Sequence, residues 1–156
     1  MNGIIEKAAF LRNEFIPLLT TIAPDTQPRW GKMNLHQMIE HMSYSLRQAN
    51  GREEYAIVTP EEHLERMRIF LESEKPFREN TPNKLLPDEP EPPKQPTIPL
   101  ALEELKREIG HFFDVFRAHP NKLITNPFFG ILNYEQWVQL LYKHAWHHLR
   151  QFGVEG

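Results

Sequence analysis

Apolar residues at helical spacing are the feature that most constrains the fold of this 156-residue chain. They recur every three or four positions in separate segments, which is typical of helices that each bury one face. The four stripes are Ile4, Ala8, Leu11, Phe15, Leu18 and Ile22; Leu35, Met38, Met42, Leu46 and Ala49; Leu102, Leu105, Ile109, Phe112 and Phe116; and Val138, Leu141, Ala145, His148 and Phe152. No convincing strand is found. The sequence therefore predicts an all-α four-helix bundle.

Local signals set the expected helix ends. Asn34 precedes the second helix and Asn133 the last, and in each case a glutamine (Gln37, Gln136) stands three residues later to complete a capping box. Pro17 should kink the first helix or end it early. The remaining bundle helix is expected from about Leu100 to Ala118, and a loop around residues 127–130 should lead to the last helix.

An extra short helix is expected outside the bundle. Thr59 is placed to cap it, Pro60 suits its first turn, and Glu62 can reach back to the cap. The segment continues to about Ser73 and is strongly charged, with a narrow apolar stripe. This composition predicts a peripheral helix.

Eight prolines fill the stretch from residue 76 to residue 99: Pro76, Pro82, Pro87, Pro90, Pro92, Pro93, Pro96 and Pro99. Proline removes backbone donors and favours extended geometry, so the stretch is neither helix nor central strand. A disordered linker is one interpretation. A long crossover held on the bundle surface, with Leu85, Leu86 and Ile98 as anchors, is the other and is slightly favoured.

Composition excludes several classes of protein. The length fits a single domain over residues 1–156, and the net charge of −3 argues against nucleic acid as a partner. There is no signal-peptide core and no apolar run of membrane-spanning length, so a cytoplasmic protein is expected. Without cysteine, any metal must be held by nitrogen and oxygen.

The last helix carries the strongest indication of function. His144 and His148 lie one helical turn apart, and Gln151 follows one turn later, so all three project from one face. His148 lies on the apolar stripe, where an unsatisfied polar group costs about 1–3 kcal/mol. A metal ion could satisfy both imidazoles. Ala145 replaces the glutamate that zincin peptidases carry after the first histidine, which excludes that mechanism. His147 should lie at the flank, facing solvent or a carboxylate near the site.

Two histidines leave a metal short of ligands, and His41 on the second helix is the best third candidate. Three neutral imidazoles with an open position suit a divalent metal, Zn or Ni first and then Fe or Mn. The alternative is that these histidines are only hydrogen-bonded to their neighbours. His36, His63 and His111 are isolated from the predicted set.

Two segments resemble a known family. The segment from Trp30 to Met42 resembles the second-helix motif of the DinB/YfiT-like superfamily, and His144-x-x-x-His148-x-x-Gln151 resembles its last-helix motif. The patterns W-G-x-M and H-x-x-H-H-x-x-Q-F-G, with Phe128-Phe129-Gly130 between them, are most similar to a bacterial branch of unknown function. The proline-rich stretch departs from the superfamily pattern and leaves the pocket shape and the substrate open.

The resemblance implies a four-helix bundle that often forms a homodimer and a metal site made by His41, His144 and His148. Gln151 would lie beside the ligands or in the pocket wall, and His147 could help to shape the pocket. Characterised members include transferases and isomerases that use the metal to activate a low-molecular-weight thiol. Two hypotheses follow: a metal-dependent enzyme for a small-molecule substrate, a transferase, isomerase or hydrolase, or a non-enzymatic metal- or ligand-binding homodimer.

Overall fold

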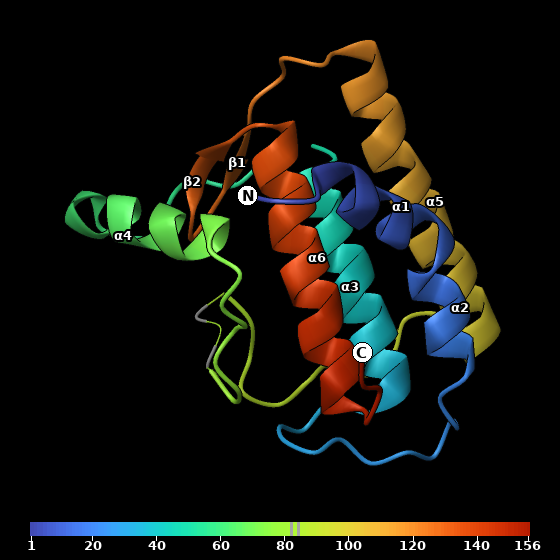
Figure 1. Ribbon diagram of the computed structural model, residues 1–156. Helices are drawn as coiled ribbons and strands as arrows, with labels where there is room; N and C mark the ends of the chain where they lie inside the picture. Colours follow the sequence, from blue (N-terminus) through green and yellow to red (C-terminus); the bar gives the residue numbers. More distant parts are fainter. Residues whose placement is uncertain (82, 84) are drawn as a thin grey trace.

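The computed structural model describes residues 1–81, 83 and 85–156. Its elements, in chain order, are α1 (Ile4–Asn13), α2 (Phe15–Thr20), α3 (Leu35–Ala49), α4 (Glu61–Glu72), α5 (Ile98–Ala118), β1 (Ile124–Asn126), β2 (Gly130–Leu132) and α6 (Tyr134–Gln151). The fold is mostly helical, as predicted (Figure 1). Pro82, one of the prolines of the predicted crossover, lies outside the described residues.

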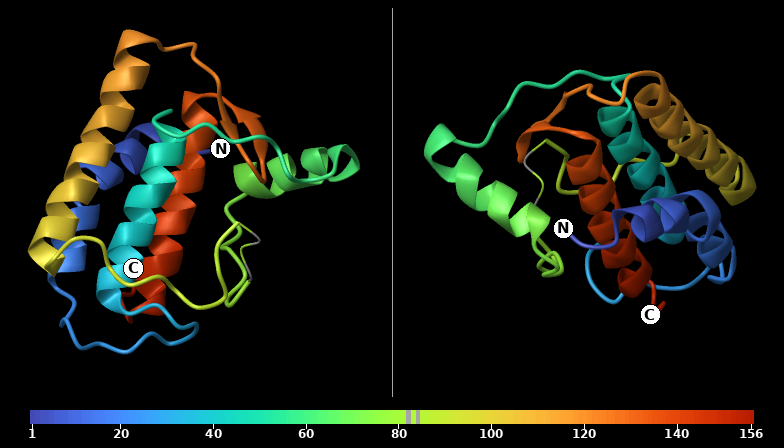
Figure 2. Two further views of the ribbon diagram at one scale, coloured as in Figure 1. Left: turned by 180° about the vertical axis from the view of Figure 1, so that it is seen from behind. Right: turned by 45° about the horizontal axis from the view of Figure 1, so that its top comes forward.

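The helices of the bundle enclose one hydrophobic core. Helix α3 packs against α5 and α6, while α1 and α2 cover the other side of α6 (Figures 1 and 2). The predicted apolar stripes form the shared interior, where Phe15, Met38, Phe112 and Trp137 are almost fully buried. Burying such large side chains contributes about 1.5–3 kcal/mol each, which explains why the stripes decide the fold.

The first predicted helix is broken into α1 and α2 at Glu14. Pro17 has no N–H to donate to the carbonyl of Asn13, four residues earlier, so the helical hydrogen bonds lapse there. The chain resumes with Leu18 N–H donating to Glu14 O at 3.0 Å. The expected effect of Pro17 is therefore confirmed.

Both predicted capping boxes are present. Asn34 accepts from the backbone of Gln37 and the Gln37 side chain accepts from the backbone of Asn34, and Asn133 and Gln136 repeat this pair at the start of α6. These two boxes pair the first backbone N–H groups of α3 and α6, and so fix where the two helices that carry the histidines begin.

The segment before α6 was predicted as a loop without strands, and this prediction is wrong. Strands β1 and β2 pair antiparallel, with Asn126 opposite Gly130. The Asn126 side-chain oxygen accepts from the backbones of Phe128 and Phe129 at 2.8 and 3.0 Å, which holds the turn. Gly130 has φ of +92°, a conformation that favours glycine.

The same hairpin explains a second error, at the start of α4. Pro60 is the N-cap of this helix and makes no side-chain cap bond, so Thr59 does not cap it. The Thr59 hydroxyl donates instead to Phe128 O at 2.8 Å, and Val58 N–H donates to Pro127 O at 2.8 Å. Contacts with the hairpin thus replace the predicted local cap.

Helix α4 projects sideways from the bundle, as expected of a peripheral helix (Figures 1 and 2). Leu71 near its end is buried, whereas Ile69 is 62% exposed. The Lys143 ammonium donates to the carbonyls of Phe70 and Ser73 at 2.6 and 3.1 Å, which ties the C-terminal end of α4 to α6.

The segment between α4 and α5 crosses the bundle in contact with α3. The Glu40 carboxylate accepts from the backbones of Lys94 and Gln95, each at 2.8 Å. Ile98 packs against the core as expected, but Leu85 is exposed and does not anchor the segment. These contacts favour the crossover interpretation over the linker.

None of the helices in the described part of the chain is long and apolar enough to cross a membrane.

Candidate functional site

Three histidines meet between α3 and α6. His41 comes from the middle of α3, and His144 and His148 come from consecutive turns of α6. The Nε2 atom of His144 lies 3.1 Å from Nε2 of His41 and 2.9 Å from Nε2 of His148. One nitrogen from each residue lies within 4.8 Å of the others, a grouping that could hold a metal ion.

A hydrogen-bond chain fixes the ring of His148. Its Nδ1 lies 2.7 Å from Oε1 of Gln151, and Nε2 of Gln151 donates to the carbonyl of Trp30 at 2.9 Å. An amide oxygen can only accept, so His148 carries its proton on Nδ1. The lone pair of its Nε2 atom therefore faces the other two histidines, which is the state of a metal ligand.

The loop before α3 closes tightly over this chain. Arg29 N–H donates to the carbonyl of Gln151 at 2.7 Å. Gly31 has φ of +77°, and a Cβ atom there would lie 3.1 Å from Nε2 of Gln151. Glycine is required at this position for both reasons, its backbone conformation and its close approach to the amide.

Burial keeps the three imidazoles neutral. It lowers the pKa of His41 to about 4, with a smaller contribution from His147. It also holds the pKa values of His144 and His148 well below the usual range, and charge repulsion between the neighbouring histidines adds to this effect. Neutral imidazole is the form that binds a metal, so ligation needs no unfavourable deprotonation near pH 7.

The donor set fits a divalent metal. The Nε2 atom of His144 faces the Nε2 atoms of both His41 and His148. A single proton on His144 can form a good hydrogen bond with only one of them. A cation among the three nitrogens would satisfy all of them. Two nitrogens bound to one zinc ion at about 2.0–2.1 Å and a tetrahedral angle are roughly 3.4 Å apart, close to the separations seen here.

Comparison with known families agrees with the geometry. Residues 11–152 match the model of the DinB superfamily. The chain belongs to this superfamily. No curated protein and no solved structure matches it. The matched range includes α3, α6 and all three histidines, so the superfamily assignment covers both helices that build the site of this DinB protein.

Aromatic side chains surround the histidines of this DinB protein. The ring of Phe77, at the start of the proline-rich stretch, lies 5.9 Å from the rings of both His144 and His147. The Trp30 ring lies 5.3 Å from the His147 ring, and the Tyr44 ring lies 6.3 Å from that of His41. Phe77 belongs to the proline-rich stretch, which therefore contributes one side of this wall.

His147 lies at the flank of α6, as predicted, but its neighbours differ from the prediction. Its ring contacts Trp30 and Phe77 rather than a carboxylate. Burial, and then the Arg150 guanidinium, lower the pKa of His147 to about 4. The residue belongs to the wall of the site and not to the three converging nitrogens.

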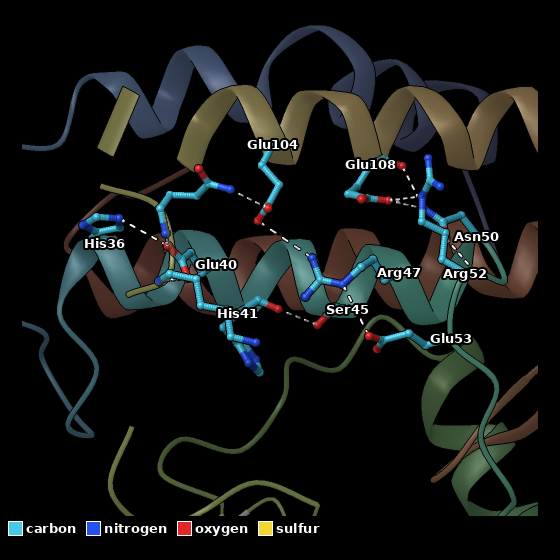
Figure 3. A network of polar contacts seen from close by, with 12 residues as sticks. His36, Glu40, His41, Ser45, Arg47, Asn50, Arg52, Glu53, Glu104 and Glu108 are labelled. Carbon is cyan, nitrogen blue, oxygen red and sulfur yellow. Dashed lines mark hydrogen bonds and ion pairs between the residues drawn. The ribbon is translucent and has the colours of Figure 1, made fainter. Parts of the chain in front are cut away.

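The remaining histidines named above lie apart from the site. His36 Nε2 lies 3.3 Å from Glu40 Oε2, and His63 Nδ1 contacts the Arg66 guanidinium at 2.8 Å. Figure 3 shows His41 projecting from α3 on the side away from Glu104 and Glu108 of α5. Polar contacts on the α5 side thus hold α3 in place while His41 faces α6.

Sequence reasoning missed the roles of Trp30, Gly31, Phe77 and Tyr44. Trp30 and Gly31 stood in the recognised W-G-x-M pattern, but the pattern does not reveal that they contact Gln151. Tyr44 follows His41 by three residues, which places both on one face of α3 and is a signal that could have been used. Phe77 had no signal in the sequence.

Proposed function

We propose that this DinB-superfamily chain is a divalent-metal-dependent enzyme whose metal is held by His41, His144 and His148. The observation that carries the proposal is the meeting of three Nε2 atoms, with the lone pair of His148 directed inward by Gln151. Zn and Ni suit three neutral imidazoles best, and Fe or Mn are the next candidates.

Bound there, the metal would act as a Lewis acid that lowers the pKa of a coordinated water or thiol. Three protein ligands leave a position for such a group. The chain itself contributes orientation and exclusion of water. Gln151 holds the His148 ring, and Trp30 and Phe77 form apolar walls that favour an uncharged part of the substrate.

The proposed substrate is a small molecule, with a low-molecular-weight thiol as the second reactant. A thiol transferase or isomerase is preferred to a hydrolase by analogy with characterised superfamily members. The apolar walls agree with this preference, because a thiolate is more nucleophilic where water is excluded. The chain has no cysteine, so the thiol must come from a cosubstrate.

Metal analysis tests the proposal directly. Purified protein should contain, or after treatment with EDTA take up, one Zn²⁺ or Ni²⁺ per chain, measured by mass spectrometry of the metal. His148→Ala should lose this metal, whereas His63→Ala, outside the cluster, should keep it. A native protein that contains no metal and rejects both ions removes the chemical basis of the enzyme. If metal binds, thiol cosubstrates are screened against electrophiles.

The second candidate is a non-enzymatic, metal- or ligand-binding homodimer. The observation that favours it is exposed apolar surface on the projecting part of the molecule: Ile69 of α4 is 62% exposed and Ile131 of β2 is 60% exposed. Light scattering after gel filtration would reveal a dimer, and Ile69→Asp should dissociate it if α4 takes part. A dimer that binds metal but turns over no thiol would favour this second function.

A further inference from the structure

The ring of Phe77 packs against the three-histidine site from outside the two helices that build it. Its centre lies 5.9 Å from the ring centres of both His144 and His147. His148 is only 5% exposed, whereas His41 and His144 are half-buried, so a molecule from solvent would reach the cluster past these two side chains. Phe77 therefore stands beside the route to the three nitrogens.

Three further groups contact the Phe77 ring and hold it in this place. The ring of Phe129, in the turn of the hairpin, stacks on it with 6.5 Å between the centres and 19° between the planes. The Phe70 ring of α4 lies 5.8 Å away, and the Lys143 ammonium lies 5.5 Å from the centre of the Phe77 ring. With neighbours from the hairpin, α4 and α6, the ring has one defined position rather than many.

Buried polar side chains anchor the backbone that leads to Phe77. The Lys143 ammonium donates to Ser73 O at 3.1 Å. The Gln139 amide also donates to Ser73 O, at 2.9 Å, and to the Glu74 carboxylate at 2.8 Å. Both donors come from α6 and are buried, so water cannot easily replace the bonds if they break. The helix that carries two of the histidines thus also holds the segment just before Phe77.

A ring held in this position restricts what can reach the histidines. A wide ligand, such as one that carries an aryl group, would need space that the Phe77 ring occupies beside His144. It could enter only by displacing the ring from its contacts with Phe70 and Phe129. A narrow ligand need not displace it. Such a steric cost discriminates between ligands that offer the same donor atom.

Given the metal-dependent function proposed above, on which this inference rests, we propose that Phe77 is its specificity-determining residue. The ring covers the three-histidine site and limits the ligands that reach the open metal position to narrow, unbranched molecules. The buried anchor formed by Gln139 and Lys143 is what keeps this cover in place. The cover itself is part of the protein without metal, so it can be tested separately from metal binding.

Chemical labelling of the metal-free protein in EDTA tests the cover. Diethyl pyrocarbonate modifies neutral imidazoles, and tandem mass spectrometry of the peptides gives the rate at each histidine. In Phe77→Ala the rate at His144 should rise at least about fivefold, because a covered group reacts only through local opening. The rate at His119, which is exposed at the end of α5, should stay the same. Leu85→Ala, which removes an exposed side chain from the same proline-rich stretch, should leave both rates unchanged.

Binding of two imidazoles to the Co²⁺-loaded protein tests the size limit. The visible spectrum of Co²⁺ changes when an added ligand takes the open position. Imidazole should bind at least about tenfold more tightly than 4-phenylimidazole, since only the second has to displace the Phe77 ring. Phe77→Ala should reduce this preference at least about fivefold, whereas Leu85→Ala should keep it.

The outcomes separate the cover from the metal site. A protein that takes up no Co²⁺ contradicts the metal site, and the labelling then decides on the cover alone. If Co²⁺ binds but 4-phenylimidazole binds as tightly as imidazole, the cover is wrong and the metal site stands. An unchanged labelling rate at His144 in a folded Phe77→Ala protein would overturn the cover as well. The comparison of the two imidazoles uses the unaltered protein, so it decides even if Phe77→Ala misfolds.

Discussion

His148 donates through Nδ1 to the side-chain oxygen of Gln151 at 2.7 Å. The amide nitrogen of Gln151 is in turn held by the carbonyl of Trp30. The loop before α3 therefore controls the direction of an imidazole on α6. Because the amide cannot rotate without losing one of its two bonds, His148 is held in one tautomer.

Loss of this amide should weaken metal binding. Gln151→Ala frees the His148 ring and removes the acceptor for Nδ1, so the affinity for Zn²⁺ should fall about 10–100-fold. Competition with a chromogenic chelator measures it. Gln27→Ala is the control, because the exposed Gln27 side chain donates to the Asp25 carbonyl within its own loop. An unchanged affinity in Gln151→Ala would show that the hydrogen bond has no part in metal binding.

Gly31 should not tolerate a side chain. Gly31→Ala places a Cβ atom 3.1 Å from the Gln151 amide in a left-handed conformation, so the free energy of unfolding should fall by about 1–2 kcal/mol. Gly110→Ala is the matched control: its Cβ meets nothing within 4 Å, and alanine in helix α5 should stabilise by roughly 0.5–1 kcal/mol. Urea unfolding separates the two, and equal effects of the same sign would contradict the role of Gly31.

Much of the fold could be predicted from the sequence because its signals are local. Apolar stripes and the two asparagine–glutamine capping boxes lie within a few residues of the helices they define. The hairpin could not be predicted in this way. Its strands have three residues each, too few for an alternating pattern, and they form because the turn at Asn126 pairs them. Thr59 was misread for the same reason, since its hydroxyl contacts a residue far along the chain.

The candidate site, too, could be predicted only in part from the sequence. Helical spacing alone places His144 and His148 on one face. The need for a third ligand points to His41 on another helix, and the family resemblance implies the same residue. The approach of their three Nε2 atoms is found in the structure, whereas metal binding stays a prediction. The placement of Phe77 over His144 depends on how the segment after α4 folds back on α6, which no pattern in the sequence reveals.

Glu40 should hold the crossover on the bundle. Its carboxylate accepts from two backbone N–H groups, so Glu40→Ala should leave the amides of Lys94 and Gln95 open to exchange. Hydrogen exchange at these two amides should become faster, and the free energy of unfolding should fall by about 1–3 kcal/mol. Glu103→Gln, exposed on α5, should change neither. Unchanged exchange in Glu40→Ala would mean that other contacts hold the crossover.

The metal-free protein should lose stability in mild acid because of its neutral histidines. The unfolded chain binds a proton at His41 below the ordinary pKa of 6.5, whereas the folded chain does so only near 4. Protonation therefore favours unfolding: the contribution is complete above 6.5 and is lost as the pH falls towards 4, by at most about 3 kcal/mol for this residue. Urea unfolding in EDTA between these pH values measures how steeply the free energy of unfolding depends on pH. His41→Gln, which cannot titrate, should make this dependence shallower.

The Glu74 carboxyl, whose pKa is lowered mainly by its hydrogen bond to Lys7, loses its own contribution in both proteins and so cancels in the comparison. Equal slopes in the two proteins would show that His41 is not the group whose neutral state the fold requires.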